Sequence, residues 1–531
     1  MPKTKFSRGY KVLLVIIVVM AALAGGWRYI DRELTQPKPL PGASAAGISW
    51  DAQFDPAPVM GQFNTHGFLA PDANGTMHGD GGQSDTHAVA GPFGAGWSVR
   101  TRTSGNGMPH QCATFVHRRD GKVVAMCGGL SGFRIVLLDP ATLELLASHD
   151  LPIRPSAFEA VVKRDMGIMM NDSSGGAYLF LDAADRVVLA NSRWVLQRLA
   201  MREQSGHWHF TVDREWDLKP YVPHDCLNWN NLFPSSECDK VTSVLPDGSG
   251  YYWWTTRNGR LGTLDPRTGR VRVIRLGGTG SRVQREEIQN SFAVDSRAVY
   301  VISDHAQYAF AADANGTPQQ LWRSPYDRGS ARKIGSINQG SGTTPTLIGA
   351  DLITFADNAD GRINVVVLDR RQGQLICKVP VFAEGASSTD NSMIGWGRSI
   401  ILENNAGYTS AHQQRDWRAV RGGMVRVDVR ADRSGCDVVW TSPIKSPSVV
   451  SKLAAGSGIV WTYSFERDER RDETRWALVG LDFNTGRPIM RIPTGVGNAF
   501  DNNWSSISLA ADGTLYLGVT QGLVQVRRNT R

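Results

Sequence analysis

The stretch Leu264-Asp265-Pro266-Arg267-Thr268-Gly269 recurs in closely similar form as Leu481-Asp482-Phe483-Asn484-Thr485-Gly486, and this repeat decides the fold. An aspartate in such a turn accepts hydrogen bonds from backbone amides two residues on, and the glycine supplies the positive φ that a tight turn requires. An apolar strand precedes each copy and another follows it. Variants of the turn stand at Leu138-Asp139, Leu181-Asp182, Ala312-Asp313, Leu368-Asp369 and Val427-Asp428.

Two short apolar strands joined by a polar turn form a second repeated feature, as in residues 114–125, 291–302 and 507–517. These hairpins centre near residues 120, 165, 247, 296, 350, 397, 457 and 512, and seven of the eight are followed by the aspartate turn. Units of four strands that repeat every ~40–50 residues are typical of a β-propeller. The sequence therefore predicts an all-β, eight-bladed β-propeller over residues 96–531, with seven blades as the alternative.

Two details of this propeller follow from the spacing. The interval between the hairpins near 165 and 247 is long enough for about one more blade. We interpret residues 192–235 as an insertion on blade two, with an extra blade as the alternative. The last repeat ends at residues 523–527, its third strand, and residues 97–103 can supply the fourth. Pairing the two ends would close the ring and remove its open sheet edges.

The N-terminus has the pattern of a targeting segment. Val12 to Ala24 is uninterrupted apolar sequence preceded by four cations. We predict a cytoplasmic tail and a transmembrane signal-anchor helix over residues 1–33, and a stalk with an irregular segment over residues 34–95. The bulk would then lie in the periplasm, tethered to the bacterial cytoplasmic membrane. A cleaved signal peptide, with Ala22-Leu23-Ala24 as the cleavage site, is the alternative.

Composition and charge exclude other classes. The 531 residues are 41% hydrophobic and 20% charged, which is ordinary globular composition. The formal net charge is +8, but residues 1–35 carry six lysines and arginines against two acids, so half of the excess lies on the targeting segment. The remainder has no basic run, and a nucleic-acid partner is not expected.

The six cysteines fit an oxidising compartment. Cys226 and Cys238 bracket one loop, Cys112 and Cys127 lie on two strands of one hairpin, and Cys377 and Cys436 lie on outer strands of neighbouring repeats. An even number in an exported chain predicts three disulfides, with buried free thiols as the alternative.

The repeated Leu-Asp-x-x-Thr-Gly turn before an outer strand resembles the quinoprotein-type (PQQ-like) repeat propellers. The resemblance covers roughly residues 96–531, and it implies an exported, commonly eight-bladed propeller that is either a quinone-dependent dehydrogenase or a non-enzymatic envelope protein. The dehydrogenases carry a vicinal cysteine pair, which this chain lacks. They also carry a tryptophan late in most repeats, and here only Trp440 is expected near that place. These departures argue against PQQ.

Residues at the start of each innermost strand converge on the axis of a propeller. Glu159, Asn290, Asp390, Asn391 and Asn503 are the candidates there for a Ca²⁺ site built from oxygen ligands. The alternative is a wet channel whose polar side chains only satisfy strand ends. His66, His78 and His87, with nearby aspartates, form a second candidate metal site, and a flexible glycine-rich loop is its alternative.

These features predict a membrane-tethered periplasmic propeller that acts as a binding or scaffold protein. Its partner would be another envelope protein or a small-molecule ligand. The alternative is an enzyme with an axial metal ion. Such an enzyme would be a calcium-dependent hydrolase of the lactonase or esterase type or a quinone-dependent oxidoreductase.

Overall fold

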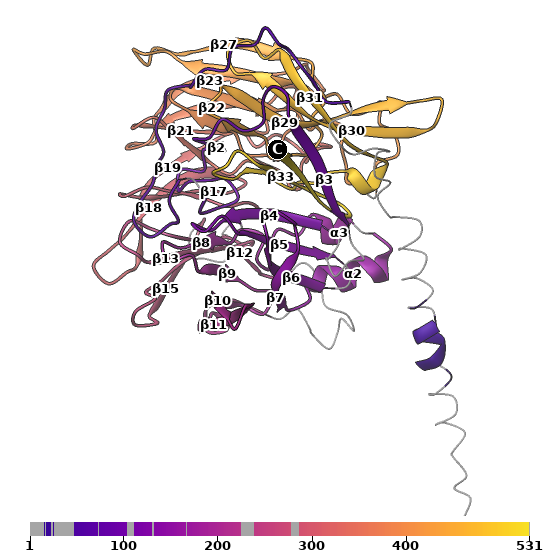
Figure 1. Cartoon of the computed structure of the whole chain (residues 1–531). Helices are drawn as coiled ribbons and strands as arrows, with labels where there is room; N and C mark the ends of the chain where they lie inside the picture. Colours follow the sequence, from indigo (N-terminus) through magenta and orange to yellow (C-terminus); the bar gives the residue numbers. More distant parts are fainter. Residues whose placement is uncertain are drawn as a thin grey trace, which may run out of the picture.

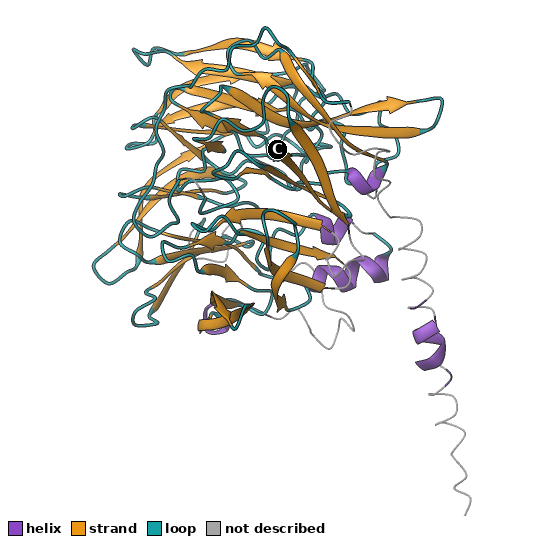
Figure 2. Cartoon of the chain, viewed as in Figure 1, coloured by secondary structure: helices purple, strands orange, loops and turns teal. Residues whose placement is uncertain are grey.

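The computed structural model describes residues 15, 17–22, 25, 47–72, 74–103, 111–129, 132–165, 167–224, 238–277, 286–411 and 413–529. Their strands form eight antiparallel sheets of four main strands each, joined by loops (Figures 1 and 2). This confirms the predicted eight-bladed β-propeller. We number the sheets as blades one to eight in chain order and give the strands of each from the axis outward.

Blades one to four comprise β4 (Gln111–His117), β5 (Val123–Gly129), β6 (Gly132–Leu138), β7 (Leu145–Leu151); β8 (Phe180–Leu181), β9 (Val187–Ala190), β10 (Val195–Gln204), β11 (His207–Asp217); β12 (Val241–Pro246), β13 (Tyr252–Thr256), β14 (Arg260–Leu264), β15 (Val271–Arg275); and β16 (Ala293–Val294), β17 (Val299–Ile302), β18 (Ala306–Ala312), β19 (Pro318–Pro325).

Blades five to eight comprise β20 (Thr346–Ile348), β21 (Leu352–Ala356), β22 (Asn364–Asp369), β23 (Leu375–Pro380); β24 (Ile394–Trp396), β25 (Ser399–Glu403), β26 (Met424–Val429), β27 (Cys436–Ser442); β28 (Lys452–Ala454), β29 (Ile459–Asp468), β30 (Glu473–Asp482), β31 (Pro488–Val496); and β32 (Ile507–Leu509), β33 (Leu515–Val519), β34 (Gly522–Arg528), β3 (Trp97–Thr103).

The ring closes as the sequence predicts. The N-terminal strand β3 pairs with β34 over seven residues, from Trp97 opposite Arg528 to Thr103 opposite Gly522. Blade eight therefore takes its outermost strand from the beginning of the propeller and its other three from the end. This pairing leaves no open edge between the first and last blades.

The aspartate turns work as the sequence predicts. The Oδ1 atom of Asp265 accepts a hydrogen bond from the backbone amide of Arg267 at 2.9 Å, and Asp482 accepts one from Asn484 at the same distance. The equivalent contacts occur at Asp139, Asp182, Asp313 and Asp369. Asp428 differs, because its carboxylate pairs with the side chain of Arg426.

Blade two departs from the prediction. The segment read as a hairpin near residue 165 contains α2 (Pro155–Lys163) and α3 (Gly167–Met170), which lie together at one side of the body (Figure 1). Ala157 and Ala160 are buried three residues apart, which is helical spacing and not strand alternation. The blade instead uses residues 180–217, so residues 195–217 of the expected insertion are its two outer strands.

Tryptophans lock neighbouring blades together. Trp440 lies on the outer strand of blade six, as expected, but Trp216 and Trp322 occupy the same place on blades two and four. The indole Nε1 of Trp322 donates to the carbonyl of Arg370 on the next blade at 3.1 Å. A Cβ on Gly373 would come within 2.6 Å of that ring, so the turn glycine makes room for it. The expectation that only Trp440 stands near this position was wrong.

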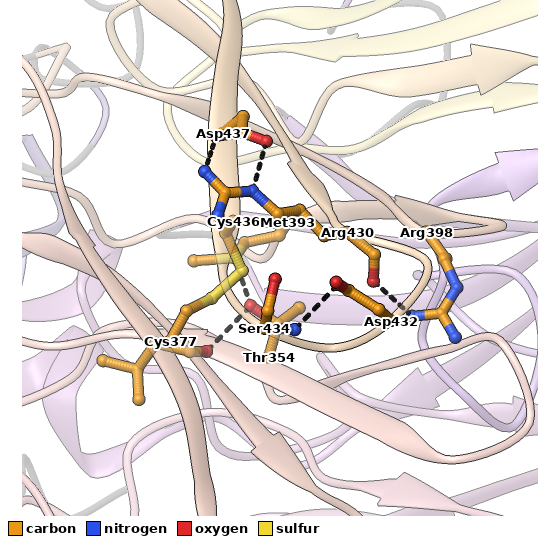
Figure 3. Close-up of a disulfide and its surroundings, with 10 residues drawn as sticks. Thr354, Cys377, Met393, Arg398, Arg430, Asp432, Ser434, Cys436 and Asp437 are labelled. Carbon is orange, nitrogen blue, oxygen red and sulfur yellow. Dashed lines mark hydrogen bonds and ion pairs between the residues drawn. A yellow bond between two sulfur atoms is a disulfide. The ribbon is translucent and has the colours of Figure 1, made fainter.

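Two of the predicted disulfides are confirmed. Cys112 and Cys127 lie directly opposite one another on β4 and β5, and Cys377 and Cys436 join the outer strands of blades five and six. Figure 3 shows the second bridge beside the ion pair of Arg430 and Asp437. Cys238 is also disulfide-bonded, and its predicted partner, Cys226, lies outside the described residues.

The N-terminal segment packs against the propeller from residue 47 onward. Strand β1 (Ser49–Trp50) extends blade seven at its outer edge, and β2 (Thr86–His87) extends the same blade at its inner edge. Both strands are part of the folded body, and they lie within residues 34–95, for which a stalk with an irregular segment was predicted. Residues 17–22 are helical, but among the described residues no helix combines the length and apolar character that spanning a bilayer requires.

Candidate functional site

The segment before β3 crosses the central channel where the innermost strands end. We call its described residues, 69–72 and 74–89, the channel floor. The amides of Val294, Leu347, Gly395, Leu453 and Ala455 donate hydrogen bonds of 2.7–2.9 Å to floor carbonyls at residues 81, 82, 84, 85 and 87. The floor is therefore bonded to blades four to seven, and Ala70 bonds it to blade two. A Cβ on Gly81 would come within 3.0 Å of the Val294 carbonyl oxygen, so close passage requires glycine there.

A buried ion cluster anchors this floor. The carboxylate of Asp85 accepts hydrogen bonds from the Lys452 ammonium, from His78 Nδ1 at 3.0 Å and from the Ser392 hydroxyl. Burial alone would raise the pKa of Asp85, but the charges and hydrogen bonds of His78 and Lys452 outweigh it and lower the pKa. Lys452 also donates to the carbonyl of Met77 at 2.8 Å. We call Asp85, Lys452, His78 and Ser392 the floor cluster.

The three histidines predicted as a second metal site have separate environments. His78 pairs with Asp85, His66 is half-buried beside Phe68, and His87 is buried. Within the described part of the chain, no three His, Cys, Asp or Glu side chains gather as a metal site requires. The glycine-rich segment that holds these histidines is bonded to the blades, so it is not the flexible loop that was the alternative.

A cavity of about 110 Å³ lies between the floor and the opposite face of the propeller, and we call it the axial chamber. Residues from blades one, four, five, six, seven and eight line it, together with floor residues Met77 and His78, which places it on the axis. Four of the five residues predicted for the axial site contribute to its wall, namely Asn290, Asp390, Asn391 and Asn503.

Glu159, the fifth predicted residue, is not among the residues that line the chamber. It lies on α2, and its carboxylate is 2.6 Å from the Lys163 ammonium. The prediction was wrong because the segment read as the innermost hairpin of blade two is helical.

The asparagines of the chamber are held by hydrogen bonds within the protein. Asn290 Oδ1 accepts from the Tyr178 hydroxyl at 3.0 Å, and Asn503 Oδ1 accepts from the Ala411 amide at the same distance. Asn391 Nδ2 donates to the Glu403 carboxyl and to a backbone carbonyl. The amide oxygens of Asn290 and Asn503 therefore already have protein donors, and Ca²⁺ binding at this set stays a prediction.

Buried acids surround the chamber. Burial raises the pKa of Asp390 to about 7, although a hydrogen bond from the Ile337 amide and the charge of Arg332 oppose the rise. Burial likewise raises the pKa of Asp501 to about 7 and of Glu403 to about 8. Asp390 is the one of these three that lines the chamber, so a carboxyl that titrates near neutrality faces the cavity.

A second cavity of about 360 Å³ leads into the chamber, and the two share Asn171, Asp172, Ile337 and Trp504 as lining residues. We call it the mouth. Four cations line the mouth against two acids; the cations are Lys240, Arg257, Arg332 and Lys333, and the acids are Asp165 and Asp172. Lysines and arginines therefore outnumber acids among the residues that line the mouth, although Arg257 also pairs with Glu287 at 3.2 Å.

Sequence reasoning missed the most polar part of the chamber wall. Arg154, Asp172 and Tyr178 all line it and all come from the segment between blades one and two. That segment has no repeat motif, and its helices were read as a hairpin. A signal was present in the run Asn171-Asp172-Ser173-Ser174-Gly175-Gly176, which is turn-forming sequence directly before an inner strand.

No family model matches the sequence, and no curated protein matches it. Similar solved structures include streptogramin B lyase, with 11% identity over 81% of this chain and 98% of that chain and a TM-score of 0.38. Sqt1 of Chaetomium thermophilum bound to the N-terminus of ribosomal protein L10 has 10% identity over 81% and 100%, with a TM-score of 0.42. The Dos1 propeller has 9% identity over 63% and 88%, with a TM-score of 0.32. At these TM-scores the likenesses carry no argument about function.

Proposed function

We propose that this protein is an exported binding protein whose axial chamber receives a small-molecule ligand. The observation that carries the proposal is the chamber itself, which has a bonded floor at one end and a continuous mouth at the other. Largely apolar cavities with a few polar groups are typical ligand sites. An envelope-protein partner stays a prediction, and so does membership of the quinoprotein-type propellers.

The cellular part of this proposal places the propeller in the periplasm, tethered by the N-terminal segment. The apolar stretch from Val12 to Ala24, with four cations before it, supports export, and so do the two disulfides that join described residues. Protease added to spheroplasts should degrade a propeller that lies outside the cytoplasmic membrane. A propeller in the cytoplasm would be protected. Release into the soluble periplasmic fraction would support the cleaved alternative, and protection in spheroplasts would overturn export.

Blocking the chamber tests ligand binding. Ala113 lines the cavity from β4, so Ala113→Trp should fill much of it. Ser148→Trp, on the exposed outer strand of the same blade, is the matched control. A low-molecular-weight extract of the source cells should raise the melting temperature of the wild type and of Ser148→Trp. It should leave Ala113→Trp unchanged. An equal rise in all three proteins, or none in the wild type, would contradict a chamber ligand.

A second candidate function is an enzyme that acts on the ligand inside the chamber. The observation that favours it is Asp390, a buried carboxyl on the chamber wall whose pKa is about 7. A group that titrates near the working pH is suited to general acid–base catalysis. Asp390→Asn should then abolish turnover of a bound ligand and keep its binding. Turnover that survives this change would exclude Asp390 as the acid or base. A metal-dependent enzyme, the original alternative, is tested by elemental analysis of the purified protein.

A further inference from the structure

One carboxylate oxygen of Asp390 is open to the axial chamber. Oδ1 accepts a hydrogen bond from the Ile337 amide at 3.0 Å, and Oδ2 accepts none from the residues that the structure describes. Oδ2 is not one of the unpartnered polar atoms that the fold seals from solvent, so it keeps accessible surface. Asp390 is 7% exposed and lines the chamber. A ligand in the chamber can therefore reach Oδ2 and donate a hydrogen bond to it.

Two amide oxygens of the wall are open in the same way. Asn391 donates through its side-chain nitrogen to the Glu403 carboxyl and to a backbone carbonyl, and Gln111 donates through Nε2 to the Asn503 carbonyl at 2.7 Å. The Oδ1 atom of Asn391 and the Oε1 atom of Gln111 accept no hydrogen bond from the described residues, and neither is sealed off. Because the nitrogens are engaged, the oxygens are the free ends of both amides.

The hydrogen-bond donors of the chamber wall are less available than these acceptors. The Tyr178 hydroxyl donates to Asn290 Oδ1 at 3.0 Å, and the Ser392 hydroxyl donates to the floor cluster. The Nε and Nη2 atoms of Arg154 are buried out of reach of the chamber. Away from the junction with the mouth, the described wall therefore presents acceptors to a ligand. A ligand that donates hydrogen bonds is the complement of such a wall.

The charge of Asp390 decides which kind of donor fits. Burial raises the pKa of Asp390 to about 7, since no cation of the described residues is bonded to the carboxylate and Arg332 acts on it only through its charge. The other charged or titratable groups of the wall are His78, Arg154, Asp172 and Tyr178. An ammonium group at Oδ2 would stabilise the ionised carboxylate and take the place of its proton. The net charge of the chamber would then stay unchanged.

Apolar side chains complete the wall and suit an alkyl body. They are those of Met77, Ala113, Met126, Phe133, Met169 and Val450. The chamber volume of about 110 Å³ is below the ~150 Å³ of an engineered cavity that accepts benzene, so the body is small. Ca²⁺ would require about six to eight oxygen ligands, whereas an ammonium group needs few acceptors and can carry this body.

We propose that the axial chamber binds a small organic ammonium ion, with the ammonium group at Asp390 Oδ2 and its alkyl body against the methionine-lined wall. This inference rests on the proposed function and names its ligand class. The cations of the mouth slow the entry of such a ligand, whereas its affinity depends on the contacts inside the chamber. Because the ammonium replaces a proton, affinity should rise with pH up to about 7.

Three probes share one alkyl body and differ in charge, namely n-butylamine, n-butanol and butyrate. An alkyl amine keeps its positive charge up to about pH 10. Isothermal titration calorimetry on the full-length protein in mild detergent at pH 8 should show that butylammonium binds at least tenfold more tightly than either other probe. At pH 6 the affinity for butylammonium should be about tenfold lower, because Asp390 must first lose its proton. Titrations in two buffers of different ionisation enthalpy should detect that released proton.

Asp390→Asn is the decisive variant. It keeps the shape of the side chain and removes the charge, so it should weaken butylammonium binding at pH 8 at least tenfold and abolish both the pH dependence and the proton release. Asp165→Asn is the matched control, because Asp165 lines the mouth and not the chamber. Its affinity for butylammonium should stay within about twofold of the wild type.

Each other outcome has a defined meaning. Butanol binding as tight as butylammonium binding, or unchanged binding in Asp390→Asn, overturns the ammonium assignment, and the second of these results is what the enzyme alternative expects. Tighter binding of butyrate overturns it in favour of an anion, and displacement of butylammonium by equimolar CaCl₂ overturns it in favour of calcium. If Asp390→Asn does not fold, proton release in the wild type decides.

Ala113→Trp separates failure of this inference from failure of the proposed function. Butanol or butyrate binding that is lost in Ala113→Trp would retain the chamber as a ligand site where the ammonium assignment fails. Absence of every ligand effect in the wild type, with the three probes and with the cell extract, removes both.

Discussion

The floor cluster and a second buried ionic group, made of Arg154, Lys240 and Asp172 and here called the chamber cluster, differ in balance. In the floor cluster, the Asp85 carboxylate accepts hydrogen bonds from Lys452, His78 and Ser392. Lys452 also donates a hydrogen bond to the backbone carbonyl of Met77. In the chamber cluster, Asp172 is shared by two cations, and two donors of Arg154 have no partner among the described residues.

The difference lies in how completely each cluster satisfies its buried polar groups. A buried polar group without a partner destabilises the fold, so a protein usually satisfies such groups internally. The floor follows this rule and fastens the N-terminal segment into the propeller. The chamber cluster departs from it, because Nε and Nη2 of Arg154 are buried and have no hydrogen-bond partner among the described residues. The following predictions test whether the two clusters differ in this way.

Lys452→Met should produce the largest loss of stability. It leaves the Asp85 carboxylate buried with no lysine, and breaking a buried ion pair from one side costs about 3–5 kcal/mol. Chemical denaturation should show the loss as a lower midpoint with a similar slope. The double variant Asp85→Asn with Lys452→Met removes both charges and should recover part of the stability that Lys452→Met alone loses. A single variant as stable as the wild type would mean that the floor does not depend on this pair.

The acids of the two regions should respond to pH with opposite signs. The folded-state pKa of Asp85 is lowered, so its stabilising contribution is complete above its unfolded pKa and is lost as the pH falls. Asp390 has a raised folded-state pKa of about 7, so the folded state binds its proton more tightly. Between pH 5 and 7 that group should make the free energy of unfolding fall by up to about 1.4 kcal/mol per pH unit.

The matched variant for this pH effect is Asp390→Asn. It removes the titrating group and should flatten the fall in stability between pH 5 and 7, measured by denaturation at each pH. Asp501 and Glu403 have raised pKa values of about 7 and about 8, so a residual slope should remain. A variant whose slope equals that of the wild type would show that Asp390 is already ionised at pH 5.

Lys240→Met should destabilise the protein less than Lys452→Met does. After Lys240→Met, Asp172 would keep the hydrogen bond from the Ser174 amide at 3.0 Å and the charge of Arg154, whereas in Lys452→Met the carboxylate of Asp85 loses its ion pair with Lys452. We expect a loss of about 1–3 kcal/mol, the range for removing one partner of a buried polar group. Thermal and chemical denaturation of the two variants side by side would check the order. A larger loss for Lys240→Met would break the comparison between the clusters.

Most of the fold could be predicted because its signals are local. The turn aspartates bond amides within a few residues, and ring closure by residues 97–103 follows from a count of strands. The prediction failed at residues 155–170, where a short helix pair replaces a hairpin. Apolar runs of this length do not distinguish helix from strand by pattern alone.

The site was predicted only where it belongs to the repeat. Asn290, Asp390, Asn391 and Asn503 stand at equivalent places in their blades, so position alone brought them to the axis. Arg154 and Asp172 lie in the connection between blades one and two, which has no repeat motif, and the floor depends on bonds between residues more than 200 positions apart. No local pattern encodes such contacts, because they arise only when the ring has closed around the N-terminal segment.

Arg154→Met should have the smallest effect on stability, and it is the sharpest test of the difference between the two clusters. The change removes a bond to the Asp172 carbonyl, but it also removes the uncompensated charge and two buried donors without partners among the described residues. Asp172 keeps Lys240 at 2.9 Å, so the pair that remains is neutral. Because replacement of an excess buried charge by an apolar side chain of similar length is often neutral, we expect a change within about 1 kcal/mol. Denaturation without added ligand measures it. A loss as large as that of Lys452→Met would mean that Arg154 holds the fold together despite its two unpartnered donors.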